Sequence, residues 1–183
     1  MGTRRRFHYA WVICAYCFIL MIFTVPLVNT LGSLYLNVVT ADFNISRSSF
    51  TFTSTIVGIC GMLLSPLWGK IYSMWRMKPV LTVAAALFSL SYMSYSLAQN
   101  AFHLYISAAC VGLTFSGCAL MPMSMLITSW FKKRRGLAMS IALGGIGIGG
   151  TCLSNLIIWV IATYGWRHGY QIVGAGVFCI IVP

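Results

Sequence analysis

The most informative feature of this chain is how little charge it carries over long stretches. Only one of its 183 residues, Asp42, is acidic, against 12 lysines and arginines. No charged residue occurs from Pro79 to Phe131, a stretch longer than a soluble helix or a buried strand needs. Because 60% of the residues are also hydrophobic, the composition excludes an ordinary soluble protein and predicts membrane-spanning helices.

The scarcity of acids also argues against several kinds of chemistry. The glycine run at residues 144–150 contains G-x-G-x-x-G, but no acidic residue follows Asp42, so the dinucleotide-binding motif is incomplete. Cys14-x-x-Cys17 lacks the further ligands that a metal site needs. No nucleophile and base are paired in a recognisable motif. We therefore expect no enzyme activity, cofactor or metal.

The apolar intervals divide into six spans, because a membrane-spanning helix needs about 20 residues. The polar pair Gln99-Asn100 separates two of them within the charge-free stretch. We expect the span cores at about residues 9–31, 50–72, 80–97, 102–130 and 137–163, and from 169 onward, with the sixth span incomplete at Pro183. These spans predict an all-α membrane protein.

The basic residues indicate the orientation of the spans. Only Arg47 and Arg167 fall on one side of the membrane. The other ten, Arg4, Arg5, Arg6, Lys70, Arg76, Lys78, Lys132, Lys133, Arg134 and Arg135, fall on the opposite side. Since short loops rich in Lys and Arg remain cytoplasmic, we expect a multi-pass plasma-membrane protein with a cytoplasmic N-terminus. The basic loop at residues 132–135 is explained by this orientation. We therefore expect the lipid bilayer as a partner and no nucleic acid.

Weak internal similarity relates the two halves of the chain. At an offset of 86 residues, Ser54 matches Ser140, Gly58 matches Gly144, and Gly61 matches Gly147. We therefore expect two copies of a three-helix unit, at about residues 7–98 and 99–183. Because three spans are an odd number, the copies are inverted in the membrane, as in many secondary transporters.

Two sets of residues within the spans are candidates for packing or binding. Small residues let membrane helices approach closely, and we expect this role for Gly58, Gly61, Gly145 and Gly149; dimerisation through the Gly145 face is an alternative. The polar residues within spans are Asn29, Thr30, Ser116, Thr151 and Asn155. They either form hydrogen bonds between helices or line a water-filled substrate path.

The loop sequences resemble the N-terminal half of the major facilitator superfamily. The first motif comprises Gly69, Lys70, Arg76 and Lys78. The second runs from Trp130 through Lys132, Lys133, Arg134, Arg135 and Gly136 to Ala138, and it leads into the glycine-rich fifth span. The second motif is similar to the oxalate:formate antiporter and monocarboxylate transporter branch. Ser73 stands where the superfamily has a gating Asp, and Leu120 and Ile146 stand where branch members tend to have aromatic residues.

The resemblance implies a function that the residues alone do not give. It implies a transporter of small organic anions, either monocarboxylates or dicarboxylates, that works by alternating access, with Asn29 and Thr30 at polar cavity positions. It also implies that a C-terminal six-helix half, beyond Pro183, supplies the basic residues that neutralise the substrate. The alternatives are a six-span fragment or assembly partner that carries no solute, and a major facilitator with a different small substrate.

Overall fold

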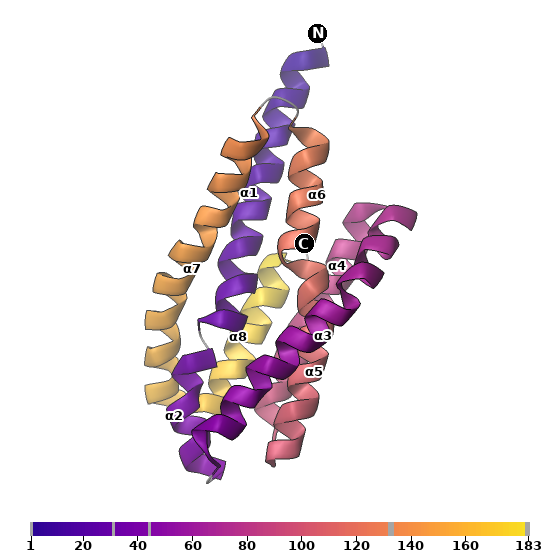
Figure 1. The fold of residues 1–183 in the computed structure, drawn as a ribbon. Coiled ribbons are helices and arrows are strands. Elements are labelled where there is room, and N and C mark those ends of the chain that lie inside the picture. The colour runs from indigo at the N-terminus through magenta and orange to yellow at the C-terminus, as the bar shows by residue number, and fades with distance from the viewer. Residues whose placement is uncertain (1, 31, 44, 132–133, 182–183) are drawn as a thin grey trace.

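A computed structural model describes residues 2–30, 32–43, 45–131 and 134–181 of the chain. These residues form helices and short connections, and no strand occurs among them (Figure 1). The helices are α1 (Gly2–Asn29), α2 (Gly32–Phe43), α3 (Arg47–Met74), α4 (Met77–Ser94), the short 3₁₀ helix η1 (Tyr95–Leu97), α5 (Ala101–Cys118), α6 (Leu120–Trp130), α7 (Arg135–Tyr164) and α8 (Trp166–Ile181).

These helices form the six expected spans, two of which are interrupted. Five stretches of the described chain are long and apolar enough to cross a membrane: Ala10–Phe43, Arg47–Met74, Met77–Leu97, Ala101–Trp130 and Arg135–Tyr164. The sixth span is α8, of which 16 residues are described. The prediction that the first span core ends at Leu31 was wrong, because α2 continues that span to Phe43 after a break.

Local sequence accounts for several of the helix ends. Ser46 caps α3, because its hydroxyl accepts a hydrogen bond of 3.2 Å from the Ser49 amide. Gly165 ends α7 with a φ of 82°, a backbone conformation that favours glycine. The chain can therefore turn from α7 into α8 within one residue.

Three of the main helix pairs relate the first half of the chain to the second in a symmetric way. The most extensive packing joins α3 to α5 and α1 to α7, and α4 packs against both α5 and α8. In terms of spans, the second packs on the fourth, the first on the fifth, and the third on the sixth. Replacing spans one to three by spans four to six reproduces the same three pairs. These three pairs fit a half-domain built from two inverted repeats, whereas the α4–α5 contact has no equally extensive counterpart between α1 and α8.

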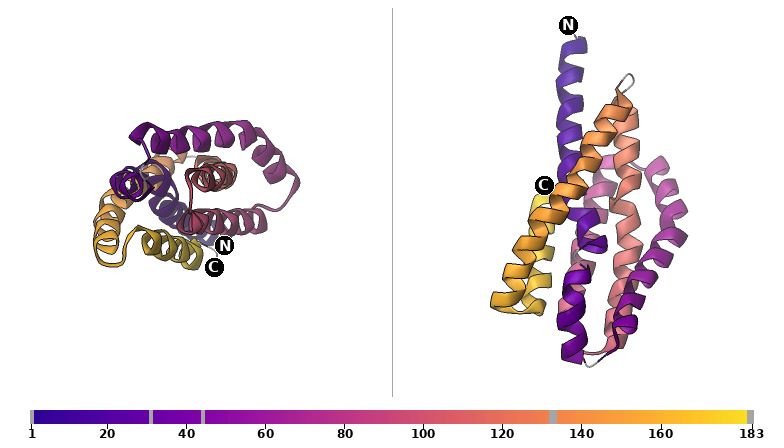
Figure 2. Two further views of the ribbon diagram at one scale, coloured as in Figure 1. Left: turned by 90° about the horizontal axis from the view of Figure 1, so that it is seen from below. Right: turned by 60° about the vertical axis from the view of Figure 1, so that its left-hand side comes forward.

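The core lies where these pairs meet, and its largest fully buried side chains include Phe88, Leu104, Met123 and Ile157. In Figure 1 the start of α1, the end of α6 and the start of α7 lie at one end of the bundle, and the end of α2, the start of α3 and the α7–α8 connection lie at the other. The two views in Figure 2 show that α3 and α7 lie on different sides of α1 and α5. We call the end that carries the N-terminus the basic end.

Candidate functional site: a cavity at two helix breaks

The fourth span is broken where α5 gives way to α6. Pro122 has no N–H to donate to the Cys118 carbonyl, and its ring crowds that carbonyl. Ala119 takes up the change with a φ of −87° and a ψ of −127°, outside the helical region. The break therefore has a direct cause in the local sequence.

The first span is broken between α1 and α2. Here Pro26 leaves the helix intact for one more turn, and the Thr30 amide donates a hydrogen bond of 2.9 Å to the Pro26 carbonyl. The Ser33 hydroxyl then donates to the Thr30 carbonyl at 2.7 Å. A side chain from the start of α2 thus satisfies a carbonyl at the end of α1.

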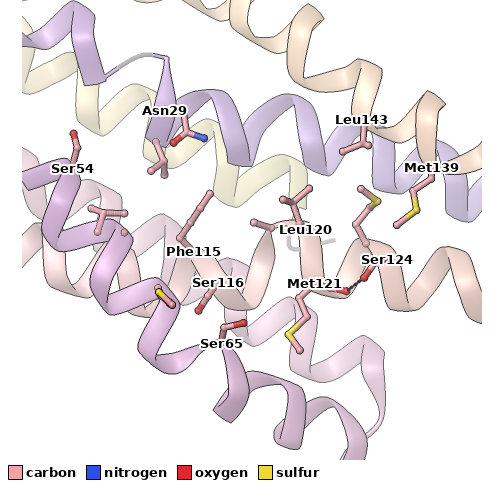
Figure 3. A pocket seen from close by; sticks show the side chains of 17 residues that line it. Asn29, Ser54, Ser65, Phe115, Ser116, Leu120, Met121, Ser124, Met139 and Leu143 are labelled. Atoms are coloured by element: carbon pink, nitrogen blue, oxygen red, sulfur yellow. Dashed lines mark hydrogen bonds between the residues drawn. The ribbon is translucent and has the colours of Figure 1, made fainter.

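Both breaks border one cavity of about 640 Å³. Its walls come from five helices: Val28 and Asn29 from α1; Ser54, Val57, Gly58, Gly61, Met62 and Ser65 from α3; Phe115 and Ser116 from α5; Ala119 at the break, with Leu120, Met121, Met123 and Ser124 from α6; and Met139 and Leu143 from α7 (Figure 3). None of these lining residues carries a formal charge. A volume of this size is typical of a small-molecule site.

The cavity brings together some of the predicted polar residues and leaves others outside. Asn29 and Ser116 line it. Thr30 lies next to it at the break, beside Gly150. Thr151 lies outside the lining, and its hydroxyl donates to the Gly147 and Ile148 carbonyls of its own helix at 3.2 and 3.1 Å. Asn155 is exposed and also lies outside, about three turns from Leu143 along α7.

Sequence reasoning missed three polar residues of the lining, Ser54, Ser65 and Ser124; the first two lie on α3. With Gly58 and Gly61 they form a stripe at spacings of four, three and four residues, which places all four on one face of α3. A stripe of small residues that includes two hydroxyls was the signal available in the sequence. Ser124 and the methionines of the lining gave no comparable signal.

The polar groups of the cavity differ in their availability to a ligand. Ser124 donates to the Met121 carbonyl at 2.8 Å, and Ser116 is oriented toward the Leu113 carbonyl at 3.4 Å. Within the described parts of the chain, no side-chain hydrogen bond is formed by Asn29, Ser54 or Ser65. Figure 3 shows Asn29 and Ser54 toward one end of the cavity and Ser65 facing Ser116 near its middle. The hydrogen-bonding groups of these three side chains are therefore not used by other described side chains.

The predicted packing glycines occupy two kinds of position. A Cβ added to Gly145 would lie 2.6 Å from the Phe18 carbonyl oxygen of α1, and one added to Gly149 would lie 2.8 Å from Ile22 Cα. On α3, a Cβ at Gly61 would meet the Gly112 carbonyl oxygen at 3.4 Å. Gly58 differs from the expectation, because its open side faces the cavity and no atom lies within 4 Å of an added Cβ.

The Ile22 carbonyl is itself unusual. Pro26 follows it by four residues and cannot donate the usual helical hydrogen bond. The backbone of Gly149 approaches this carbonyl so closely that a side chain would overlap it. Gly149 on α7 therefore lies against the Ile22 carbonyl on α1, which accepts no helical hydrogen bond because Pro26 has no N–H.

The motif residues of the loops lie at the basic end of the bundle. Gly69 and Lys70 belong to the last turns of α3, Arg76 precedes α4, and Lys78 is in the first turn of α4. In the second motif, Arg135 Nε donates to the Phe131 carbonyl at 2.8 Å, while Arg134 and Gly136 are exposed at the start of α7. Lys132 and Lys133 lie outside the described residues.

Across the described residues, no three His, Cys, Asp or Glu side chains come close enough together to hold an ion. Cys14 is buried, and its sulfur lies 3.6 Å from the Ala138 carbonyl oxygen, between α1 and α7. Its role there is consistent with helix packing.

Comparison with known proteins gives consistent matches. A model of the Major Facilitator Superfamily matches residues 2–182. Mouse monocarboxylate transporter 11 is 28% identical over 169 residues, which cover 91% of this chain and 37% of that protein. Mouse monocarboxylate transporter 12 is 27% identical over 175 residues, which cover 95% of this chain and 36% of that protein.

A relative with a different named substrate also matches. The riboflavin transporter RibJ of Trypanosoma cruzi is 33% identical over 124 residues, which cover 64% of this chain and 26% of that protein. The chain thus spans little more than a third of the length of the curated relatives it matches.

Proposed function

The chain belongs to the Major Facilitator Superfamily, and on that premise we propose that it forms one half of a secondary transporter for small organic anions. It is an integral, multi-pass membrane protein of the monocarboxylate transporter branch. In the proposed cycle, this half rocks against a second six-helix half, so that the cavity faces each side of the membrane in turn. No catalytic step is expected.

The observation that carries this proposal is the position of the cavity at both helix breaks. Transporters commonly bind their substrates where interrupted helices expose backbone groups near the middle of the membrane. Here α6 begins at the cavity with Leu120, and Ala119 provides no side-chain cap for its first amides. Uncapped amides at the start of a helix favour negative charge. This supports an anion as the substrate.

The domain organisation is part of the proposal. The pairing of the spans supports two inverted units at about residues 7–98 and 99–183. The lining residues offer an anion hydrogen bonds but no opposite charge, and neutral hydrogen bonds of about 0.5–1.5 kcal/mol net do not offset the desolvation of an anion. We therefore propose that residues outside this half supply the positive charge.

The proposed location is the plasma membrane, with the N-terminus and the basic end in the cytoplasm. Single cysteines placed next to Gln99 and next to Lys133 test the orientation in intact cells, using a membrane-impermeant thiol reagent. We expect the first position to be labelled and the second to be protected until the cells are opened. The reverse pattern would contradict the proposed topology.

Uptake by proteoliposomes tests the function itself. Protein expressed from its complete reading frame should take up labelled pyruvate, lactate, formate or oxalate in a saturable manner, whereas residues 1–183 alone should not. Asn29→Leu should lower uptake about tenfold, because it removes an available amide from the cavity. Asn155→Leu is the matched control, since this exposed amide lies outside the cavity, and it should change uptake less than twofold.

The alternatives predict different results in the same assay. Saturable uptake of riboflavin with no uptake of the acids would indicate a substrate like that named for the trypanosome relative. A folded protein that takes up no solute from either group would favour an assembly partner that does not transport.

A further inference from the structure

Four tyrosines meet toward the end of the bundle opposite the basic end, where the first, third and sixth spans come together (Figure 1). Their side chains are 0–8% exposed, and they are Tyr35 of α2, Tyr92 of α4, Tyr95 of η1 and Tyr170 of α8. The centroid of the Tyr170 ring lies 4.0 Å from that of the stacked Tyr35 ring. It also lies 5.3 Å from that of Tyr92 and 5.2 Å from that of Tyr95. Within the described parts of the chain, none of the four hydroxyls forms a hydrogen bond.

Three of these tyrosines line a second pocket, which is much smaller than the cavity described above. We call it the tyrosine pocket; its lining includes Tyr92, Tyr95 and Tyr170, together with Val28 from the end of α1 and Gly32 from the start of α2. Its volume is about 40 Å³. One water molecule needs about 10–15 Å³ of such space, so the pocket has room for a few water molecules and is too small for an organic solute.

The hydroxyl of Tyr35 is in a different situation from the other three. It is sealed against α8, where a Cβ on Gly169 would lie 2.9 Å from it, and Tyr35 is outside the lining of the tyrosine pocket. Among the described residues, Tyr35 carries the one sealed side-chain oxygen or nitrogen that has no partner. The other three hydroxyls also lack partners but keep some accessible surface, and because their residues are at most 8% exposed, we place that surface in the pocket.

The break in the first span brings backbone groups to the same pocket. The last carbonyls of one helix and the first amides of the next lack helical partners. In the described chain, no hydrogen bond joins the Gly32 amide to the Val28 carbonyl across the break. On α3, the Thr53 hydroxyl lines the pocket and donates to the Phe50 carbonyl at 2.6 Å, so it can still accept a hydrogen bond. The pocket therefore combines donors and acceptors from four spans.

From this arrangement we infer that the tyrosine pocket is a structural water site, at which ordered water joins the broken first span to the third and sixth spans. Burying three hydroxyls without hydrogen bonds would be costly. Water both donates and accepts, so a few molecules satisfy the hydroxyls and the backbone groups at the break together. Water can enter from the larger cavity, because Val28, Ser54 and Val57 line both spaces. The inference does not depend on which solute is transported.

Water fits this pocket better than an ion does. The lining described for the pocket contains no charged residue, and an ion buried there would have no opposite charge beside it. Phenolic hydroxyls and backbone amides are neutral hydrogen-bonding groups, which suit a neutral ligand that can bond to several of them at once.

X-ray radiolysis of the unaltered protein, expressed from its complete reading frame, detects bound water directly. The radiation converts a bound water molecule into a hydroxyl radical that modifies the adjacent side chain, and mass spectrometry locates the modification. We expect Tyr92, Tyr95 and Tyr170 to be modified severalfold faster than Tyr35. Tyr35 is the matched control, because it has the same side chain and is buried in the same cluster outside the pocket. Equally slow modification of all four tyrosines would overturn the inference.

Removal of single hydroxyls tests what the water contributes. Tyr95→Phe and Tyr170→Phe keep the packed rings but each removes a partner of the water, so each should lower the melting temperature by about 2–4 °C. Tyr35→Phe removes a hydroxyl that has no partner and should leave the melting temperature unchanged or raise it. A dry pocket predicts instead that all three variants behave alike, without a loss.

Two further outcomes would contradict the inference. A loss for Tyr35→Phe as large as that for Tyr95→Phe would mean that the ring cluster, rather than water in the pocket, responds to the change. A melting temperature that is higher in sodium than in choline chloride, with the difference absent in Tyr95→Phe, would mean that the pocket holds a cation. We expect the unaltered protein to melt at the same temperature in both salts.

Discussion

The first and fourth spans are both broken near the cavity, but they are held in different ways. The fourth span is held by its neighbour α3. Trp68 Nε1 donates to the Leu113 carbonyl at 2.7 Å, and the Tyr72 hydroxyl donates to the Gly117 carbonyl at 2.5 Å. The Trp68 ring also occupies the space where a Cβ on Gly117 would lie, at 2.6 Å.

At the break in the first span, the hydrogen bonds lie within the span itself. They join Thr30 to Pro26 and Ser33 to Thr30. Asn29 and Thr30 are exposed at this break. We therefore expect the fourth span to move together with α3 during transport, and the break in the first span to adjust to the ligand.

The two spans also differ in where their glycines lie. The first span packs on Gly145 and Gly149 of α7, so the glycines belong to its partner. In the other pair, the fourth span carries the glycine, because a Cβ on Gly112 would lie 2.6 Å from the Val57 carbonyl oxygen of α3. In both pairs a backbone atom blocks the position of the Cβ, and a backbone atom cannot move aside as a side chain can.

The largest effect should come from filling these glycine contacts. We expect Gly149→Leu and Gly112→Leu each to destabilise the fold by more than about 3 kcal/mol, since inserting bulk into a close-packed site costs about 1–3 kcal/mol even where neighbours can adjust. The measurement is the yield of monodisperse protein in mild detergent together with its melting temperature. Both variants should give little folded protein.

Gly147→Leu is the matched control for Gly149→Leu, because it adds the same bulk to the same helix where no atom lies within 4 Å of the added Cβ. If Gly149→Leu folds as well as Gly147→Leu, the close approach of α1 and α7 described here is wrong.

Much of the fold could be predicted from the sequence, because the cost of placing charge in lipid limits where helices can cross. The spans of α3, α4 and α7 lie within a few residues of their expected ranges. The helix breaks could not be predicted from proline alone. Pro122 breaks its span three residues earlier, Pro26 precedes a break by several residues, and Pro66 leaves α3 continuous. Three prolines within spans thus have three different outcomes, so a proline alone does not locate a break.

The cavity was only partly predictable for a related reason. A polar residue within a span indicates that it avoids lipid, but it does not indicate which neighbour it faces. Asn29 and Ser116 reach the cavity, whereas Thr151 bonds within α7 and Asn155 lies outside the lining. Ser54 and Ser65 reach it because they share a helix face with Gly58 and Gly61. Which neighbour a polar side chain faces depends on its position around the helix and on how the helices pack, and a count of polar residues gives neither.

A smaller effect should follow from removing the bond between α3 and the broken fourth span. Tyr72→Phe deletes the hydroxyl that donates to the Gly117 carbonyl. Hydrogen bonds between membrane helices contribute about 0.6 kcal/mol on average and up to about 1.7 kcal/mol. We expect a loss near the upper value, because Tyr72 is buried, measured as a lower melting temperature in detergent.

Two further variants sharpen the contrast between the spans. Tyr164→Phe removes a hydroxyl from a residue that is 56% exposed and should leave the melting temperature unchanged. Ser33→Ala removes the bond at the break in the first span, where the exposed carbonyl can find another partner. It should cost less than Tyr72→Phe. An equal or greater loss for Ser33→Ala would contradict the view that α3 holds one break more firmly than the first span holds the other.

The smallest effect should come from the end opposite the basic end, where the first span meets the sixth. Asp42 lies 4.0 Å from Arg167, and both side chains are about half exposed, at 49% and 52%. Trp166 Nε1 also donates to the Asp42 carboxylate at 3.2 Å. Asp42→Asn removes the charge but keeps an oxygen that can accept from Trp166. Because exposed ion pairs contribute about 0–1 kcal/mol, we expect a loss below about 0.5 kcal/mol that disappears at high salt.

Arg167→Gln provides the comparison for this small effect. The Arg167 guanidinium lies 5.1 Å from the centre of the Trp166 ring, so this variant removes a cation–π contact as well as the ion pair. A cation–π contact at an exposed site contributes about 0.5–1 kcal/mol. Arg167→Gln should therefore lower the melting temperature more than Asp42→Asn, and the difference should persist at high salt. A loss of stability for Asp42→Asn as large as that for Tyr72→Phe would contradict this order. It would mean that this end of the first span is held as firmly as the break in the fourth span.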